Sequence, residues 1–175
     1  MQNLIIGSFL TGKTTLLNSL TSSLQSQSIY SLSKIVAIDK NQVFDNLNSI
    51  IDKFDKGAFP NSKLFFVEGS LLEILAYSAV LKDLKKITIE NFNMIYNKVE
   101  KYFRHNKFKY ILFCQNDSKV EGGVAVNLIR QQIQDYIFRF IYLFTGKFSF
   151  HEGYLSLNGS LNTRLEYMNS LNLLK

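Results

Sequence analysis

Cysteine and histidine are scarce in this chain of 175 residues, and their scarcity excludes two kinds of site. A single cysteine, Cys114, cannot form a disulfide within the chain, which is typical of a reducing compartment and predicts a cytoplasmic protein. The two histidines, His105 and His151, are scattered relative to Cys114, and no ligand spacing typical of zinc is present. We therefore expect neither a structural disulfide nor a zinc centre.

Long hydrophobic runs are also missing. The longest, residues 136–144, is interrupted by Arg139 and is far shorter than the roughly 20 residues that a membrane-spanning helix needs. The first residues lack a basic segment, and the apolar run at 4–6 is too short for a secretory signal. We therefore expect no membrane partner.

Arginine and proline are rare, whereas lysine, asparagine, isoleucine and phenylalanine are abundant. Only four of the twenty basic residues are arginines, and this bias is typical of coding in an AT-rich genome. The net charge of +6 is spread along the chain, which favours a solvated surface over a nucleic-acid patch. We do not expect a nucleic-acid partner. A steep salt dependence of binding would be the evidence for one.

Short apolar segments alternate with segments of helical periodicity along the whole chain, which we interpret as one domain, residues 1–175. Strands are predicted at 3–6, 34–38, 64–67, 110–114 and, more weakly, 154–157. Helices are predicted at 14–25, 42–54, 71–84, 89–103, 126–144 and 161–173. Apolar strands each followed by a helix predict an α/β fold of three layers, a five-stranded parallel sheet with helices on both faces. Ligands of such sheets bind beyond the carboxyl ends of the strands.

The segment directly after the first predicted strand matches the full P-loop pattern, G-x-x-x-x-G-K-[ST]. Glycines let the backbone turn its N–H groups toward phosphate oxygens, and the following helix adds its N-terminal dipole. The lysine would contact the β and γ phosphates, and the threonine hydroxyl would bind Mg²⁺. The expected cofactors are thus ATP and Mg²⁺, and the alternative is a glycine turn with an incidental lysine. The predicted nucleotide-binding residues are Gly7, Ser8, Phe9, Leu10, Thr11, Gly12, Lys13, Thr14 and Thr15.

Motifs of other P-loop classes are absent from the sequence. No Asp-x-x-Gly follows a predicted strand, and Asn97-Lys98 lacks the aspartate of a guanine-binding motif, which excludes a GTPase. The third predicted strand ends in Glu68-Gly69, whereas a motor or an oligomeric ATPase usually has Asp-Glu or Asp-Asp there.

Residues 67–78, Val-Glu-Gly-Ser-Leu-Leu-Glu-Ile-Leu-Ala-Tyr-Ser, resemble the element after the third strand of small nucleoside and nucleotide kinases. The likeness is closest to the nicotinamide riboside kinase-like ATPases of the AAA_28 type, with thymidylate and deoxynucleoside kinases more distant. Those proteins usually carry an arginine at the position of Gly69. The resemblance continues at residues 121–130, similar to the family's lid entry, and at 154–171, similar to its last strand, turn and helix. It implies a helical lid over residues 117–146, in which Arg130 stands in for a missing lid arginine.

Carboxylates after the predicted strands are candidates for catalysis and metal binding. The resemblance implies that Asp39, after the second predicted strand, accepts the proton of the substrate hydroxyl; the alternative is an N-cap before Val43. Glu68 ends the third strand and is a candidate for the catalytic site, for substrate binding and, with Thr14, for Mg²⁺.

Three further side chains are candidates for the acceptor and the transferred phosphate. Glu73 and Tyr77 lie one helical turn apart and could line the acceptor pocket, although Tyr77 could equally be a core residue. Arg130 could stabilise the transferred phosphoryl group in the transition state, the alternative being a solvated helix residue. With Lys13, Asp39 and Glu68, it completes the predicted catalytic set.

The sequence thus predicts phosphoryl transfer from ATP to a small acceptor: a nucleoside, a nucleoside monophosphate or nicotinamide riboside. The alternatives are an NTPase switch that has no small-molecule acceptor and a degenerate nucleotide-binding protein that acts through a partner. The sequence does not choose among the acceptors. The apolar helix at 129–144 could also serve a homodimer interface.

Overall fold

The computed structural model describes residues 2–20, 26–28, 43–55, 66–115 and 123–174. Its strands are β1 (Gln2–Ile6), β2 (Ser26–Ser28), β3 (Phe66–Glu68), β4 (Phe108–Cys114) and β5 (His151–Leu157). Its helices are α1 (Lys13–Leu20), α3 (Val43–Asp55), α4 (Leu71–Asp83), α5 (Ile89–His105), α6 (Gly123–Phe148) and α7 (Leu161–Ser170).

The strands form one sheet in the order β2-β3-β1-β4-β5, and every neighbouring pair is parallel. The predicted α/β class with a parallel sheet is confirmed. Strand β1 is central, with Ile5 paired to Glu68 of β3 on one side and to Leu112 of β4 on the other. After β1 the chain forms β2 and β3 on one side of β1, and it then crosses to form β4 and β5 on the other side. The loop after β1 therefore lies at the position where the strand order reverses, which is where open α/β sheets bind ligands.

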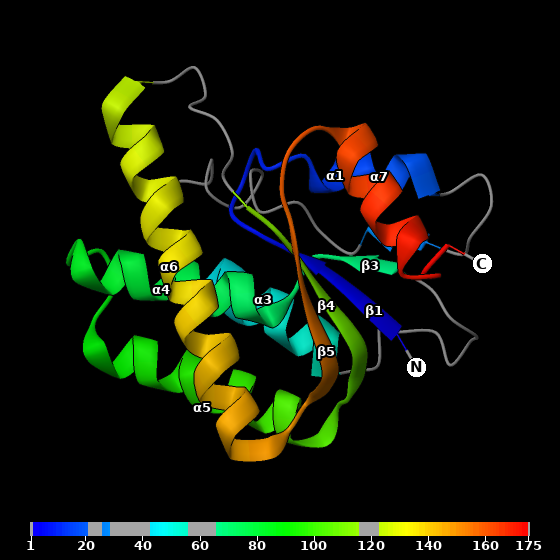
Figure 1. Ribbon diagram of the computed structural model, residues 1–175. Helices are drawn as coiled ribbons and strands as arrows, with labels where there is room; N and C mark the ends of the chain where they lie inside the picture. Colours follow the sequence, from blue (N-terminus) through cyan, green and yellow to red (C-terminus); the bar gives the residue numbers. More distant parts are fainter. Residues whose placement is uncertain (1, 21–25, 29–42, 56–65, 116–122, 175) are drawn as a thin grey trace.

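Helices cover both faces of the sheet, with α1 and α7 on one face and α3, α4, α5 and α6 on the other (Figure 1). Successive residues of a strand point to opposite faces. In β1, Leu4 and Ile6 pack with the four-helix face, and Ile5 packs with the α1 and α7 face. Strand β4 repeats the alternation with Ile111 and Leu112. These strands are apolar on both sides because both sides are buried.

Helix α6 is anchored in the larger of the two cores by its C-terminal half. Its buried side chains include Ile133, Ile137 and Phe144, and the Phe144 ring lies 5.9 Å from that of Phe103 on α5. Part of the predicted lid, residues 117–146, is thus a packed helix, and residues 117–122 lie outside the described residues. Movement of this segment over the phosphates stays a prediction.

The second strand and the helix α6 differ from their predicted positions. The predicted strand at 34–38 lies outside the described residues, whereas β2 is formed by the polar sequence Ser-Gln-Ser, which carries no apolar strand signal. Helix α6 is longer at both ends than the predicted 126–144. In the described ranges, no helix combines the length and the hydropathy required to cross a bilayer.

Candidate phosphate-binding site

The loop that follows β1 is shaped by close packing and by two residues with positive φ. A β-carbon at Gly7 would lie 2.4 Å from the carbonyl oxygen of Cys114 in β4, so only glycine fits there. Leu10 has φ 58° and Gly12 has φ 78°, values that turn the chain back toward the start of α1. The first helical bond across this junction joins Leu16 N–H to the carbonyl of Gly12 at 2.9 Å.

Lys13 points into the loop rather than into solvent. Its ammonium donates to the carbonyl oxygens of Gly7 at 3.0 Å and Ser8 at 2.6 Å, and the side chain is only 5% exposed. The charge is therefore fixed at the centre of the loop, where a nucleotide's phosphates would be contacted.

Glu73 reaches the same place from the first turn of α4. Its Oε1 accepts the N–H of Gly7 at 3.0 Å and lies 3.8 Å from the Lys13 ammonium, with no exposed surface. Burial raises the pKa of the Glu73 carboxyl to about 7, against the opposing effects of Lys13 and the Gly7 bond, and Glu68 raises it further. Helix α4 starts where β3 ends, next to β1, and this brings its first-turn residue under the loop.

Thr14 and Glu68 meet at the end of β3. The Thr14 hydroxyl donates to Glu68 Oε1 at 2.6 Å, and Glu68 Oε2 is buried without a hydrogen-bond partner in the described structure. A hydroxyl and a carboxylate fit Mg²⁺, which prefers oxygen ligands and is usually held by one or two protein groups plus phosphates. No cluster of three or more His, Cys, Asp or Glu side chains suited to a metal occurs among the described residues.

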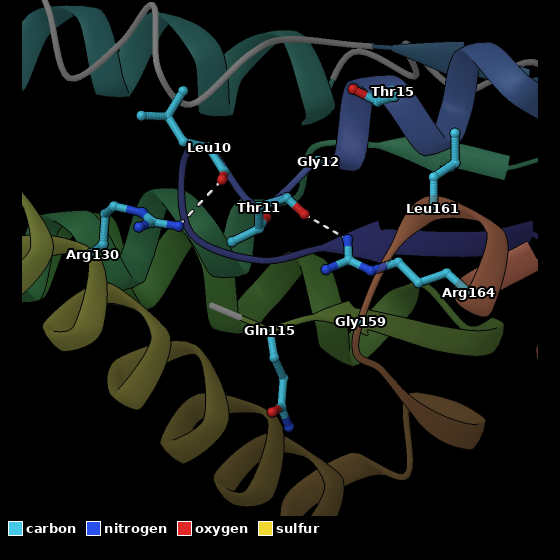
Figure 2. Close-up of a pocket in the computed structure, with 9 residues that line it drawn as sticks. All are labelled: Leu10, Thr11, Gly12, Thr15, Gln115, Arg130, Gly159, Leu161 and Arg164. Atoms are coloured by element: carbon cyan, nitrogen blue, oxygen red, sulfur yellow. Dashed lines mark hydrogen bonds between the residues drawn. The ribbon is translucent and has the colours of Figure 1, made fainter. Parts of the chain in front are cut away.

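Two arginines hold the outer edge of the loop (Figure 2). Arg130 of α6 donates from Nε to the carbonyl of Phe9 at 3.0 Å and from Nη2 to that of Leu10 at 3.2 Å. Arg164 of α7 donates from Nη1 to the carbonyl of Thr11 at 2.6 Å. Both side chains are buried, and burial lowers the pKa of Arg130, although an arginine stays charged at neutral pH. The two guanidinium groups place positive charge on either side of the loop.

A pocket of about 280 Å³ opens beside these arginines. Gln115, directly after β4, is one of its lining residues, and its amide donates to the hydroxyl of Ser156 in β5 at 2.6 Å. Figure 2 shows Arg130 and Arg164 pointing toward the loop from two different helices. The lining residues are Leu10, Thr11, Gly12, Thr15, Gln115, Arg130, Gly159, Leu161 and Arg164.

Most of the predicted site residues come together in the structure. Lys13, Thr14, Glu68 and Glu73 form one cluster around the loop, and Arg130 binds the loop from outside. Tyr77 is 6% exposed and belongs to the larger core, where burial raises the pKa of its hydroxyl. Asp39 lies outside the described residues, and its role as a base stays a prediction.

Gln115, Gly159 and Arg164 were missing from the predicted site. Gln115 directly follows the fourth strand, a position that pointed to ligands but carried no recognisable motif. Arg164 is separated from its partner Thr11 by 153 positions, so no local pattern could reveal the contact.

No protein-family model matches the chain, and no curated protein matches it significantly. Solved structures do match it over nearly the whole chain. A deoxyadenosine kinase from M. mycoides with the products dCMP and dCDP is 16% identical, with a TM-score of 0.70 and full coverage of both chains. A thymidylate kinase from Candida albicans is 13% identical, with a TM-score of 0.58 over 99% of this chain and 93% of the other.

The NadR protein in complex with NAD and AMP-PNP is another structural match. It is 16% identical, with a TM-score of 0.69, and the match covers 98% of this chain but 48% of NadR. At these identities the likeness shows the fold alone. The chain has the fold of the P-loop nucleoside and nucleotide kinases, and the finer resemblance to the AAA_28 type stays a prediction.

Proposed function

We propose that the protein transfers a phosphoryl group from ATP–Mg²⁺ to a small nucleoside or nucleotide acceptor. The observation that carries the proposal is the cluster of Lys13, Thr14 and Glu68 at the carboxyl ends of the neighbouring strands β1 and β3. Such a cluster would supply a cation for the phosphates and oxygen ligands for the metal, both of which phosphoryl transfer needs. The fold shared with nucleoside and nucleotide kinases supports it.

The chain's own residues would act by binding and positioning. Backbone N–H groups of residues 8–14 and the N-terminus of α1 would bind the phosphates, and the Lys13 ammonium would neutralise them. Thr14 and Glu68 would hold Mg²⁺, which supplies charge compensation when bound. The pocket beside Arg130 and Arg164 would take the remainder of the nucleotide.

The acceptor is proposed only as a class. The deoxyadenosine kinase, the thymidylate kinase and NadR share this fold although their names point to different ligands. The fold therefore does not select among nucleosides, nucleoside monophosphates and nicotinamide riboside. Asp39 is proposed to accept the proton of the acceptor hydroxyl, and Arg130 to contribute charge beside the transferred group.

Gly69 is the observation that favours the alternative, an ATP-binding switch or degenerate nucleotide-binding protein. It stands where the similar kinases usually have arginine, and its φ of 95° suits glycine rather than a side chain. A charge expected near the phosphates is thus missing from this position.

ATP consumption by the purified protein tests the proposal, measured with Mg²⁺ and a panel of nucleosides, nucleoside monophosphates and nicotinamide riboside. ADP release should rise with one acceptor and disappear in Lys13→Ala. ADP release that is the same with every acceptor would support the switch. ATP binding without ADP release would support the degenerate binder.

A further inference from the structure

Glu73 is a buried carboxylate that has no role in the phosphoryl transfer proposed above. It has no exposed surface, and one of its oxygens, Oε1, both accepts the Gly7 N–H and faces the Lys13 ammonium. The other oxygen, Oε2, is buried without a hydrogen-bond partner anywhere in the described ranges. The carboxylate therefore lies beside the phosphate loop with one of its two oxygens free of hydrogen bonds in the described structure.

The charged groups around Glu73 come from three elements. Lys13 of α1 is the cation, and Glu68 of β3 is a second acid that disfavours the ionised form. Cys114 of β4 interacts with the same groups, but burial raises the pKa of its thiol to about 11, so it is neutral. The ionised form of Glu73 is thus favoured by the ammonium of Lys13 and by the N–H of Gly7.

A phosphate bound to Lys13 would compete with Glu73 for that ammonium. The nucleotide would also bring negative phosphate charge close to an already buried acid, and the Mg²⁺ bound with it would offset part of that charge. A buried carboxylate whose cation is taken away is strongly destabilised, and such a group normally becomes protonated instead. The proton is available from solvent, and Oε2 can carry it.

We propose that Glu73 is the exchangeable counter-charge of Lys13, which holds the ammonium in the loop and takes up one proton when phosphate replaces it. The Lys13–Glu73 ion pair is exchanged for a Lys13–phosphate pair, and one proton moves from solvent to a carboxylate oxygen. Glu73 is a positioning residue, because it contacts the loop and the lysine rather than the substrate. The inference rests on the nucleotide binding proposed above but not on the identity of the acceptor.

The proton affinity of Glu73 agrees with this exchange. With a pKa of about 7, the carboxyl is partly ionised at neutral pH and can gain a proton at little cost. Nucleotide binding should therefore weaken as the pH rises, by about tenfold between pH 6 and pH 8 if binding requires the protonated form.

Calorimetric titration of ATP–Mg²⁺ into the full chain tests the exchange. Runs at pH 6, 7 and 8, each in two buffers of different ionisation enthalpy, give the Kd and the number of protons taken up. We expect uptake of about half a proton per ATP at pH 7 and nearly one at pH 8.

Glu73→Gln is the decisive variant, because the amide oxygen can still accept the Gly7 N–H while the charge is lost. It should bind ATP–Mg²⁺ without the Glu73-linked proton uptake, and at pH 8 about tenfold more tightly than the wild type. Any pH dependence that belongs to the nucleotide itself remains in this variant. Glu152→Gln, an exposed change at the amino end of β5, should behave as the wild type.

Each result decides between the two proposals. Equal proton uptake in the wild type and Glu73→Gln, or tighter wild-type binding at high pH, would overturn the counter-charge role and leave the kinase proposal standing. The expected proton uptake without any acceptor-dependent transfer would keep the role and remove the kinase. Wild-type protein that binds no ATP would overturn both. If Glu73→Gln does not fold, wild-type binding of ATP without proton uptake still overturns the counter-charge role.

Discussion

Asn3 is the residue at which the central strand departs most from an apolar core. It is fully buried on β1, on the same strand face as Ile5, and neither its Nδ2 nor its Oδ1 has a hydrogen-bond partner in the described structure. Asn3→Val should raise the free energy of unfolding by about 1–2 kcal/mol, because two unsatisfied polar groups are replaced by a β-branched apolar one. Urea unfolding measures the change.

Asn18→Val provides the matched control for Asn3, since Asn18 is exposed on α1. This second variant should leave the stability unchanged or slightly lower, because no buried polar group is removed. A loss of stability in Asn3→Val would mean that the amide makes bonds, for instance to water, that outweigh its desolvation.

Glu73 also predicts how stability depends on pH. Its pKa is about 7 in the fold and near the ordinary value of 4.5 in the unfolded chain. Because the folded pKa is the higher one, the contribution of Glu73 to stability is complete below pH 4.5 and is lost as the pH rises through 7. Glu73→Gln should therefore gain stability relative to the wild type between pH 5 and pH 8, by about 3 kcal/mol at most.

Chemical unfolding of both proteins at pH 5 and pH 8 measures this difference. Parallel curves, with the same gap at the two pH values, would show that Glu73 keeps an ordinary pKa in the folded protein. The counter-charge role would then lose its electrostatic support.

At the scale of elements, α4 is positioned by its N-cap. The Ser70 hydroxyl accepts the N–H of Leu72 at 3.1 Å, which fixes the turn between β3 and the helix that carries Glu73. Ser70→Ala should lower the free energy of unfolding by about 1 kcal/mol and should weaken ATP binding as well.

Thr88→Ala separates these two effects. Thr88 caps α5 by accepting the N–H of Asn91 at 3.2 Å, and α5 carries none of the site residues. The variant should lose a similar amount of stability and keep its ATP affinity. If both variants bind ATP equally well, the start of α4 is not a determinant of the site.

Helix α6 contacts the phosphate loop through Arg130, whose planar guanidinium donates to two successive carbonyls. A lysine provides a single ammonium and cannot reproduce this pair of bonds. Arg130→Lys should therefore weaken ATP binding about tenfold, which corresponds to roughly one charged hydrogen bond, while the fold is kept. Arg139→Lys, at an exposed position on the same helix, is the control and should change nothing.

The sequence predicts the local features of this protein better than the contacts between its elements. The P-loop is recognisable because its residues are consecutive, and the strands predicted at 3–6 and 110–114 follow from their short runs of apolar residues. Glu73 and Gly7 are 66 positions apart in the sequence. Helix α4, which carries Glu73, could be placed next to the loop only once the strand order was known. The polar strand β2 and the arginine contacts to loop carbonyls likewise depend on tertiary structure.

On the scale of the whole molecule, ligand binding should be visible as stability. At a free concentration of 100 times its Kd, ATP–Mg²⁺ should stabilise the fold by about 2.7 kcal/mol. For a domain of this size that corresponds to a rise in Tm of roughly 5–10 °C. Lys13→Ala, which removes the charge at the centre of the loop, should show little of this rise.

A second ligand distinguishes a kinase from a protein that only binds ATP. A kinase has two sites in one cooperative unit, so an acceptor added on top of a non-hydrolysable ATP analogue should raise the Tm further. A degenerate binder or an acceptor-free switch has only the nucleotide site, and no member of the acceptor panel should add to its Tm. The acceptor that produces the second rise should also be the one that accelerates ADP release. A second rise without acceleration would mean that the acceptor site is intact and that the transfer step itself has been lost, as the glycine at position 69 would allow.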